Sequence, residues 1–127
     1  MSASAYKAVY SAIVSKLTRT GVSVGRTAGY PRVEVHSITE NERMDKGGSV
    51  RVLALTVESM TTSSLVAADT LNEGNLALLD TMNGTRAGAF RIVGIVPTQL
   101  QDLTETSDTQ RIIYRLLQGL DIYVEAQ

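Results

Sequence analysis

The sequence predicts an α+β fold in the order α-β-β-α-β-β, with a mainly antiparallel sheet and two helices packed on one of its faces. Apolar residues recur at helical spacing in two segments, whereas four other segments are rich in Val, Ile, Leu and Tyr. Short polar links join the strands in pairs, which favours hairpins. With 127 residues, the chain suits a single domain that spans residues 1–127.

The first element is predicted to be a helix over residues 4–20. Gly21 follows it, where a left-handed residue commonly ends a helix. Residues 21–31 then form a glycine-containing link, and Pro31 directs the chain into an extended conformation. The apolar stripe of the helix consists of Tyr6, Val9, Tyr10, Ile13, Val14 and Leu17.

A β-hairpin is predicted next. Residues 32–38 alternate, so that Val33 and Val35 share one face and polar side chains share the other. Residues 40–49 are polar and end in a Gly-Gly turn signal. Residues 50–60 form a long strand with two largely apolar faces, which places this strand centrally in the sheet.

The second helix is predicted to begin at a cap among residues 61–64 and to end at Gly84. Gly74 costs about 1 kcal/mol relative to alanine inside a helix, so we expect it to permit close approach of the helix to the sheet. The buried stripe is expected to consist of Ala67, Ala68, Leu71, Gly74, Leu78, Leu79 and Met82.

Two further strands are predicted on either side of a polar turn at residues 104–109. The first begins at Phe90, and Pro97 should bend it or place it at a sheet edge. Residues 110–125 fit a helical stripe as well as a strand, and periodicity does not decide between them. We favour a long strand that bends near Gly119, because Ile, Tyr and Val dominate its ends.

The composition argues against several kinds of chemistry. The chain has no cysteine, which removes disulfides, thiolate metal sites and thiol nucleophiles. Lys and Arg number 12 against 13 Asp and Glu, and this net charge of −1 does not suit a basic surface for nucleic acid. No apolar run approaches the ~20 residues that cross a bilayer, and the first residues lack the pattern of a secretory signal. We therefore expect neither a membrane nor sequence-specific nucleic acid as a partner.

The sequence also predicts no enzyme activity, no catalytic residues, no metal and no cofactor. His36 is the single histidine, and without a second histidine or a cysteine it is interpreted as a solvated surface residue. Asp102, Glu105 and Asp108 lack the ligand spacing of a calcium loop. Residues 21–26 contain glycines but lack the Lys-Ser/Thr ending of a P-loop.

Several landmarks follow one another in a characteristic order. They are the N-terminal helix, Tyr30-Pro31 before a short strand, an acidic turn, the long strand over residues 50–58, and a final apolar strand ending in Tyr123-Val124-Glu125. Over nearly the whole chain, this order and spacing resemble the tail terminator proteins of tailed bacteriophages, also called minor tail or tail completion proteins. The polar segment 98–109 departs from the pattern and leaves the register of the last hairpin open.

The resemblance implies assembly rather than catalysis. Members of this family form hexameric rings at the head-proximal end of the tail tube, where they stop tube polymerisation and join the tail to the head connector. The implied partners are other copies of the chain, the tail tube protein and the head–tail connector protein, with DNA passing through the ring. The implied location is the tail or neck of the virion, assembled in the cytoplasm of the host bacterium.

Charged residues in two segments form the candidate assembly interface. In the first segment an apolar, flexible methionine lies among charges, a composition that suits a contact. In the second, two arginines share a face if they lie on a strand, where they can meet acidic residues of a neighbouring subunit. A solvated hairpin tip and solvated arginines are the alternatives. The candidate residues are Glu42, Arg43, Met44, Lys46, Arg111 and Arg115.

Two other functions stay open at this point. The first is another neck component of similar size, such as a head–tail adaptor or a head-completion protein. The second is a small oligomeric enzyme or ligand-binding domain whose site lies between subunits. The sequence disfavours an enzyme because it lacks a recognisable pairing of nucleophile and base.

Overall fold

A computed structural model describes residues 3–25, 29–36, 39–43, 50–106 and 111–126. Its order contains the expected α-β-β-α-β-β and adds four short strands. No helix in these ranges is long and apolar enough to cross a membrane. The elements are α1 (Ala3–Leu17), β1 (Ser23–Val24), β2 (Arg32–Val35), β3 (Thr39–Arg43), β4 (Val50–Thr61), α2 (Leu65–Asp80), β5 (Arg86–Ala87), β6 (Phe90–Asp102), β7 (Glu105–Thr106) and β8 (Ile112–Ala126).

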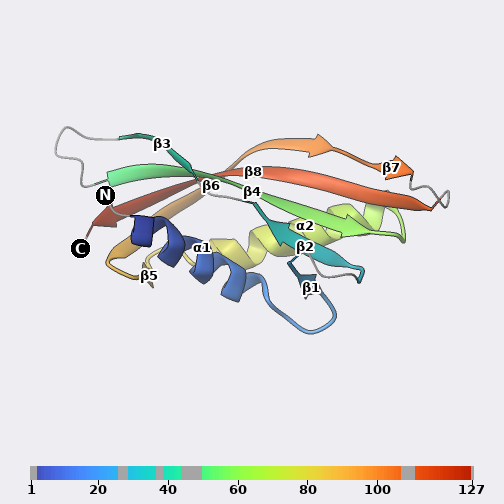
Figure 1. Cartoon of the computed structure of the whole chain (residues 1–127), viewed down its shortest axis with the longest axis horizontal. Helices are drawn as coiled ribbons and strands as arrows, with labels where there is room; N and C mark the ends of the chain where they lie inside the picture. Colours follow the sequence, from blue (N-terminus) through green and yellow to red (C-terminus); the bar gives the residue numbers. More distant parts are fainter. Residues whose placement is uncertain (1–2, 26–28, 37–38, 44–49, 107–110, 127) are drawn as a thin grey trace.

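The strands form a mainly antiparallel sheet in the order β1-β2-β4-β8-β6-β5. β3 also pairs with β4, and β7 also pairs with β8. Both helices lie on the same side of this sheet (Figure 1), which confirms the predicted α+β class. We call the side that the helices cover the inner face and the opposite side the outer face.

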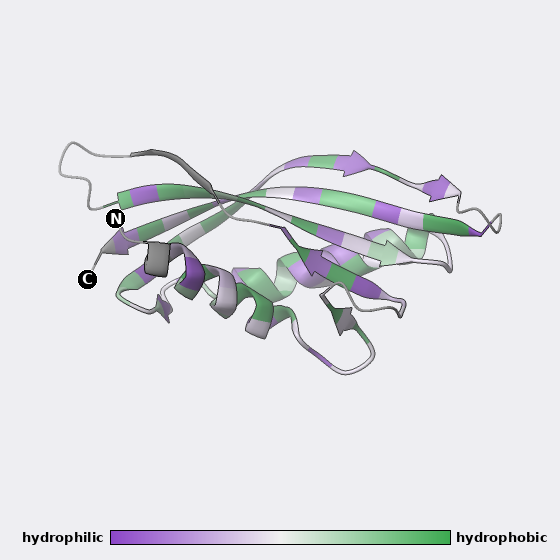
Figure 2. Cartoon of the chain, in the orientation of Figure 1, coloured by the Kyte–Doolittle hydropathy of each residue, from purple (hydrophilic) through white to green (hydrophobic). Residues whose placement is uncertain are grey.

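The predicted central strand is β4, which lies between β2 and β8 and pairs with β8 along its whole length. Leu53, Leu55 and Val57 point from it into the core between sheet and helices, and each is at most 2% exposed. Val52 and Met60 alternate with them on the outer face and are also buried. Two apolar faces therefore identified a central strand correctly. Hydrophobic residues are spread along the long strands that lie against the helices, whereas the residues of β7 are hydrophilic (Figure 2).

α1 packs its predicted stripe against the sheet. Ile13 and Leu17 are fully buried, and the hydroxyl of Tyr10 donates a hydrogen bond of 3.0 Å to the carbonyl oxygen of Val35 in β2. The helix ends at Leu17, earlier than predicted. Gly21 has the expected positive φ, 85°, but lies in the turn after the helix rather than at its C-terminal cap.

α2 begins where a cap was expected. Ser64 is its N-cap, and the Ser64 Oγ accepts a hydrogen bond of 3.0 Å from the backbone N–H of Ala67. The expected reason for Gly74 is wrong. A Cβ at this position would face the guanidinium of Arg19 at 3.8 Å, at an ordinary contact distance, and would not meet the sheet.

Two asparagines lie on the buried side of α2 in addition to apolar residues. The amide of Asn75 donates to Ser59 Oγ in β4 at 2.9 Å, and its Oδ1 accepts from the guanidinium of Arg19 at 2.8 Å. The amide of Asn72 donates to Gln118 Oε1 in β8 at 3.2 Å. The bonds of Asn75 offset the cost of burying its amide, whereas Asn72 Oδ1 is buried without a hydrogen-bond partner among the described residues.

The last hairpin is formed by β6 and β8, so residues 112–126 are a strand and not a helix. Its register shifts twice, and the second shift lies between Pro97 and Leu100, where the sequence predicted a bend. Gly119 has a different role from the one expected. A Cβ there would lie 2.5 Å from Thr98 Oγ1, so glycine allows the irregular segment of β6 to lie close against β8.

Two segments that were expected to be polar turns are in part strands. Thr39–Arg43 pairs with β4 as β3, and Glu105–Thr106 pairs with β8 as β7. Each continues the pairing of the preceding strand along a long neighbour, which offers backbone hydrogen bonds whatever the side-chain composition. The rest of these turns, residues 44–49 and 107–110, lies outside the described residues.

Candidate assembly surface

The predicted interface residues lie at two ends of the sheet. Glu42 and Arg43 belong to β3, at the end where β8 finishes, whereas Arg111 directly precedes β8 and Arg115 lies near its start. Figure 1 shows β3 and β7 at these opposite ends. About nine residues of β4 separate them, which corresponds to roughly 30 Å at the rise of a strand. The candidates outside the described residues are Met44 and Lys46.

Arg115 belongs to a charge network on the outer face, which we define as His36, Glu58, Glu105 and Arg115. Glu58 is 2% exposed and accepts a hydrogen bond from the Nε of Arg115 on one carboxylate oxygen. Its other oxygen lies 3.0 Å from His36 Nε2. Arg115 also donates from Nη1 to Glu105 at 2.9 Å. The network therefore connects β4, β7, β8 and the residue after β2.

The electrostatics of the network keep its central carboxyl ionised. Burial, the largest single influence, raises the pKa of Glu58, but hydrogen bonds and charges from Arg115 and His36 together lower that pKa below its ordinary value. The hydrogen bond to Glu58 raises the pKa of Arg115, although burial opposes this. A buried carboxylate with two donors is a satisfied structural group.

The surroundings of His36 differ from those predicted. It lies on the polar face of the hairpin as expected, but its ring is half-buried against Glu58 rather than solvated. Ligand atoms of Glu34, His36 and Glu58 all lie within 4.8 Å of one another. Both oxygens of Glu58 already accept hydrogen bonds, so a cation would have to displace Arg115 or His36 from them. The sequence contained one signal of this network. It was Glu58, an acidic residue in an otherwise largely apolar strand.

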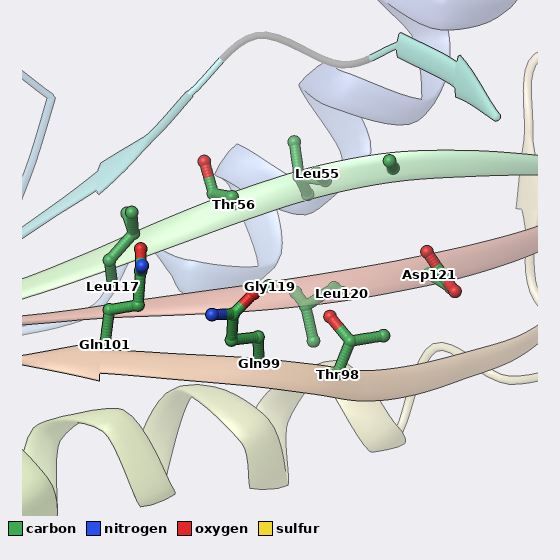
Figure 3. Close-up of a pocket in the computed structure, with 10 residues that line it drawn as sticks. Leu55, Thr56, Thr98, Gln99, Gln101, Leu117, Gly119, Leu120 and Asp121 are labelled. Carbon is green, nitrogen blue, oxygen red and sulfur yellow. The ribbon is translucent and has the colours of Figure 1, made fainter.

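A pocket of 280 Å³ lies on the outer face at the register shift between β6 and β8 (Figure 3). Its floor is Gly119, and the polar side chains of Thr98, Gln99 and Gln101 come from β6. Among its described lining residues, Asp121 is the single titratable group. This lining offers hydrogen bonds but no pairing of acid and base for catalysis.

Exposed large apolar side chains are concentrated in one stretch of the chain, and four of the seven lie on β6 or directly after it in the described part. All large hydrophobic residues exposed in the described part of the chain lie between the start of α2 and the start of β8. Beyond Ile92, which still pairs with Gly84 and Thr85, the outer edge of β6 has no paired strand among the described residues. The sequence offered this edge as one of two outcomes of Pro97, but it did not predict that apolar side chains of the edge strand would be exposed. The exposed residues are Leu65, Val66, Val93, Val96, Leu100, Leu103 and Ile112.

No protein-family model matches this chain, and no curated protein matches it. Among solved structures, the fold is similar to that of a chain in the virion of a native gene transfer agent (GTA) particle. The TM-score is 0.70 and the sequence identity 16%, and the match covers 98% of this chain and 100% of that one. At this identity the similarity establishes a shared fold over essentially the whole length of both chains.

Proposed function

We propose that this chain is a structural virion protein that acts as a tail terminator. In this proposal it forms a hexameric ring at the head-proximal end of a phage tail tube, ends tube polymerisation and joins the tail to the head connector. The observation that carries the proposal is the apolar edge along β6, where exposed side chains adjoin an unpaired part of the strand. The shared fold with a virion chain and the terminator-like order of elements support it.

An edge of this kind is a liability for a protein that stays alone. A long edge strand with apolar side chains promotes association, and soluble monomers usually cover or charge such edges. A head-to-tail ring covers the same edge in every copy, because each contact pairs two different surfaces and the rotation closes. Assembly therefore explains a feature that would be unfavourable in an isolated subunit.

The ring would leave two faces for different partners, the tail tube protein and the head–tail connector protein, with DNA passing through the centre. Glu42, Arg43, Met44 and Lys46 would form one contact. The role would place the chain in the tail or neck of the virion, after assembly in the cytoplasm of the host bacterium. No step of this role needs a catalytic group or a cofactor.

A head–tail adaptor or head-completion protein is the second candidate, because the structural neighbour comes from a virion and a shared fold does not specify its position there. Tube length separates the two. Tail tube protein would be polymerised alone and with this chain, and tube lengths would be measured by negative-stain microscopy. A terminator gives short tubes with a ring at one end. Tubes of unchanged length without end-bound rings would contradict the terminator role.

The predicted hairpin contact has its own test. Reversing charge at Arg43→Glu and Lys46→Glu should leave the far-UV circular dichroism spectrum unchanged and impair ring formation or tail joining. The reason is that complementary charges set the register of a contact. Normal assembly of this variant would show that the hairpin end is only solvated.

A further inference from the structure

We propose that a groove between α2 and β6 receives the β5–β6 corner of a second copy of this chain. We define the α2–β6 groove by Leu65, Val66, Asp69 and Glu73 of α2 with Leu100 and Asp102 of β6. The β5–β6 corner consists of residues 86–91. This inference rests on the proposed ring and names the contact that closes it.

The groove has two hollows of 340 Å³ each. One lies between the start of α2 and the end of β6, and the other lies between the last part of α2 and the middle of β6. Together they follow the length of α2 along the unpaired part of β6. A segment lying here would cover apolar side chains and reach the free backbone groups of the strand.

The floor and rim of the groove have a distinct chemistry. Val66 is 76% exposed, and Leu65 and Leu100 are 44% and 47% exposed, which is high for apolar side chains that lie close together. The titratable residues lining the two hollows are all acidic, and α2 contains no Lys or Arg. The occupant that fits is therefore small or apolar at its tip and basic at its sides. The acidic lining residues are Asp69, Glu73, Asp80 and Asp102.

The β5–β6 corner has that complementary chemistry. Arg86 and Arg91 lie directly opposite each other across the two strands, and both are exposed. Like charges facing each other across strands cost stability within one subunit, although Glu125 lies across from Arg91 in β8. Between the arginines, Gly88 lies against Ala8 of α1, whereas the adjoining Ala89 is exposed and small enough to enter a groove.

The positions of the two surfaces indicate a head-to-tail contact. β5 lies at one end of the molecule, and the start of α2 lies towards the other (Figure 1). A two-fold contact centred on either surface would place acidic grooves or arginine pairs against each other, which is unfavourable. Pairing each groove with the next corner instead uses different surfaces on each copy, as a ring requires.

Charge exchange tests this contact directly. One variant carries Asp69→Arg and Asp102→Arg in the groove, a second carries Arg86→Glu and Arg91→Glu in the corner, and a third carries all four substitutions. Native mass spectrometry would measure assembly, and circular dichroism would verify folding. Each of the first two should raise the concentration at which rings dissociate by roughly a hundredfold or more, because like charges then face each other.

Restoration distinguishes a contact from simple damage. The four-substitution chain should form rings again, and an equal mixture of the two reversed variants should form rings of alternating copies. A control with Ser15→Arg and Thr20→Arg also adds positive charge at exposed positions but lies outside both surfaces, so it should assemble normally. Val66→Lys places a charge on the groove without touching the core and should prevent assembly like the groove reversal.

Rings that persist in both reversed variants and in Val66→Lys would overturn the inference and leave the proposed function standing. Folded variants that fail to assemble in every combination would also overturn it. Groove variants that form rings but no longer cap tubes would assign the groove to the tail tube protein instead of a second copy. A wild-type chain that neither assembles nor caps tubes would refute the proposed function itself.

Discussion

Gly119→Ala probes the close approach of β6 to β8 at the register shift that borders the outer pocket. A Cβ at this position would lie 2.5 Å from Thr98 Oγ1 and 3.4 Å from the carbonyl oxygen of Gln99. The Thr98 hydroxyl is attached directly to a β-branched carbon, so it moves away only if the side chain changes its χ1 rotamer. Gly94 in β6 is a matched control, because a Cβ there would meet Tyr123 at 3.7 Å, an ordinary contact distance.

Two effects of opposite sign determine the result. Replacing glycine by alanine at an unstrained position stabilises a protein by about 0.4–1 kcal/mol, because it restricts the unfolded chain. Forcing an extra methyl group into a packed contact costs about 1–3 kcal/mol. For Gly119→Ala the cost outweighs the gain, and we expect a net loss of about 1–2 kcal/mol. For Gly94→Ala only the first effect acts, and stability should stay equal or rise.

Urea unfolding followed by circular dichroism measures both variants, and the midpoint should fall for Gly119→Ala while the slope stays unchanged. Adding Thr98→Ala to Gly119→Ala removes the nearest overlapping atom and should recover part of the loss. If Gly119→Ala is as stable as Gly94→Ala, β6 does not approach β8 as closely at the register shift as described, and the pocket is shaped differently.

The same unfolding assay checks two other predictions. Leu55→Ala should lose about 2–5 kcal/mol because it empties part of the core, and a loss near zero would show that Leu55 is not buried. The lowered pKa of Glu58 means that its carboxylate contributes stability above its ordinary pKa, and this contribution is lost as pH falls through the folded-state pKa. Between about pH 7 and about pH 3, the wild type should therefore lose more stability than Glu58→Gln, and equal losses would contradict the charge network.

Much of the fold could be predicted because local patterns and tertiary packing agree. The stripe through Ile13 and Leu17 faces the core, and both apolar faces of the strand around Leu55 are covered. Periodicity was ambiguous between helix and strand for the last segment. The β-branched and aromatic residues at its ends correctly favoured the strand that the structure has over residues 112–126. The local sequence of these elements was therefore enough to predict them.

The remaining features depend on partners that are distant in sequence. Asn72 and Asn75 are buried because Gln118 and Ser59 offer hydrogen bonds, and no local pattern reveals such partners. The short strands β3 and β7 form because long neighbours extend beside them, whatever their own composition. Propensity is a weak guide wherever tertiary contacts satisfy the backbone or a buried amide.

The candidate surface was the least predictable part of the molecule. Charge alone grouped Arg43 with Arg115, yet the sheet places them at opposite ends, and Arg115 has carboxylate partners in its own chain. The apolar residues Val96 and Leu100 have the composition of a buried strand, and their exposure follows from the edge position of β6. The order of strands in the sheet therefore identifies an exposed apolar surface on β6 that the composition of the strand does not reveal.

Native mass spectrometry of the purified wild-type chain tests the central claim most directly. If the chain acts by assembling, its spectrum should show one closed species at a fixed integer multiple of the subunit mass, hexameric in our proposal, that persists on dilution. A spectrum that shows only the single subunit, at concentrations where it is added to tail tubes, would contradict the account.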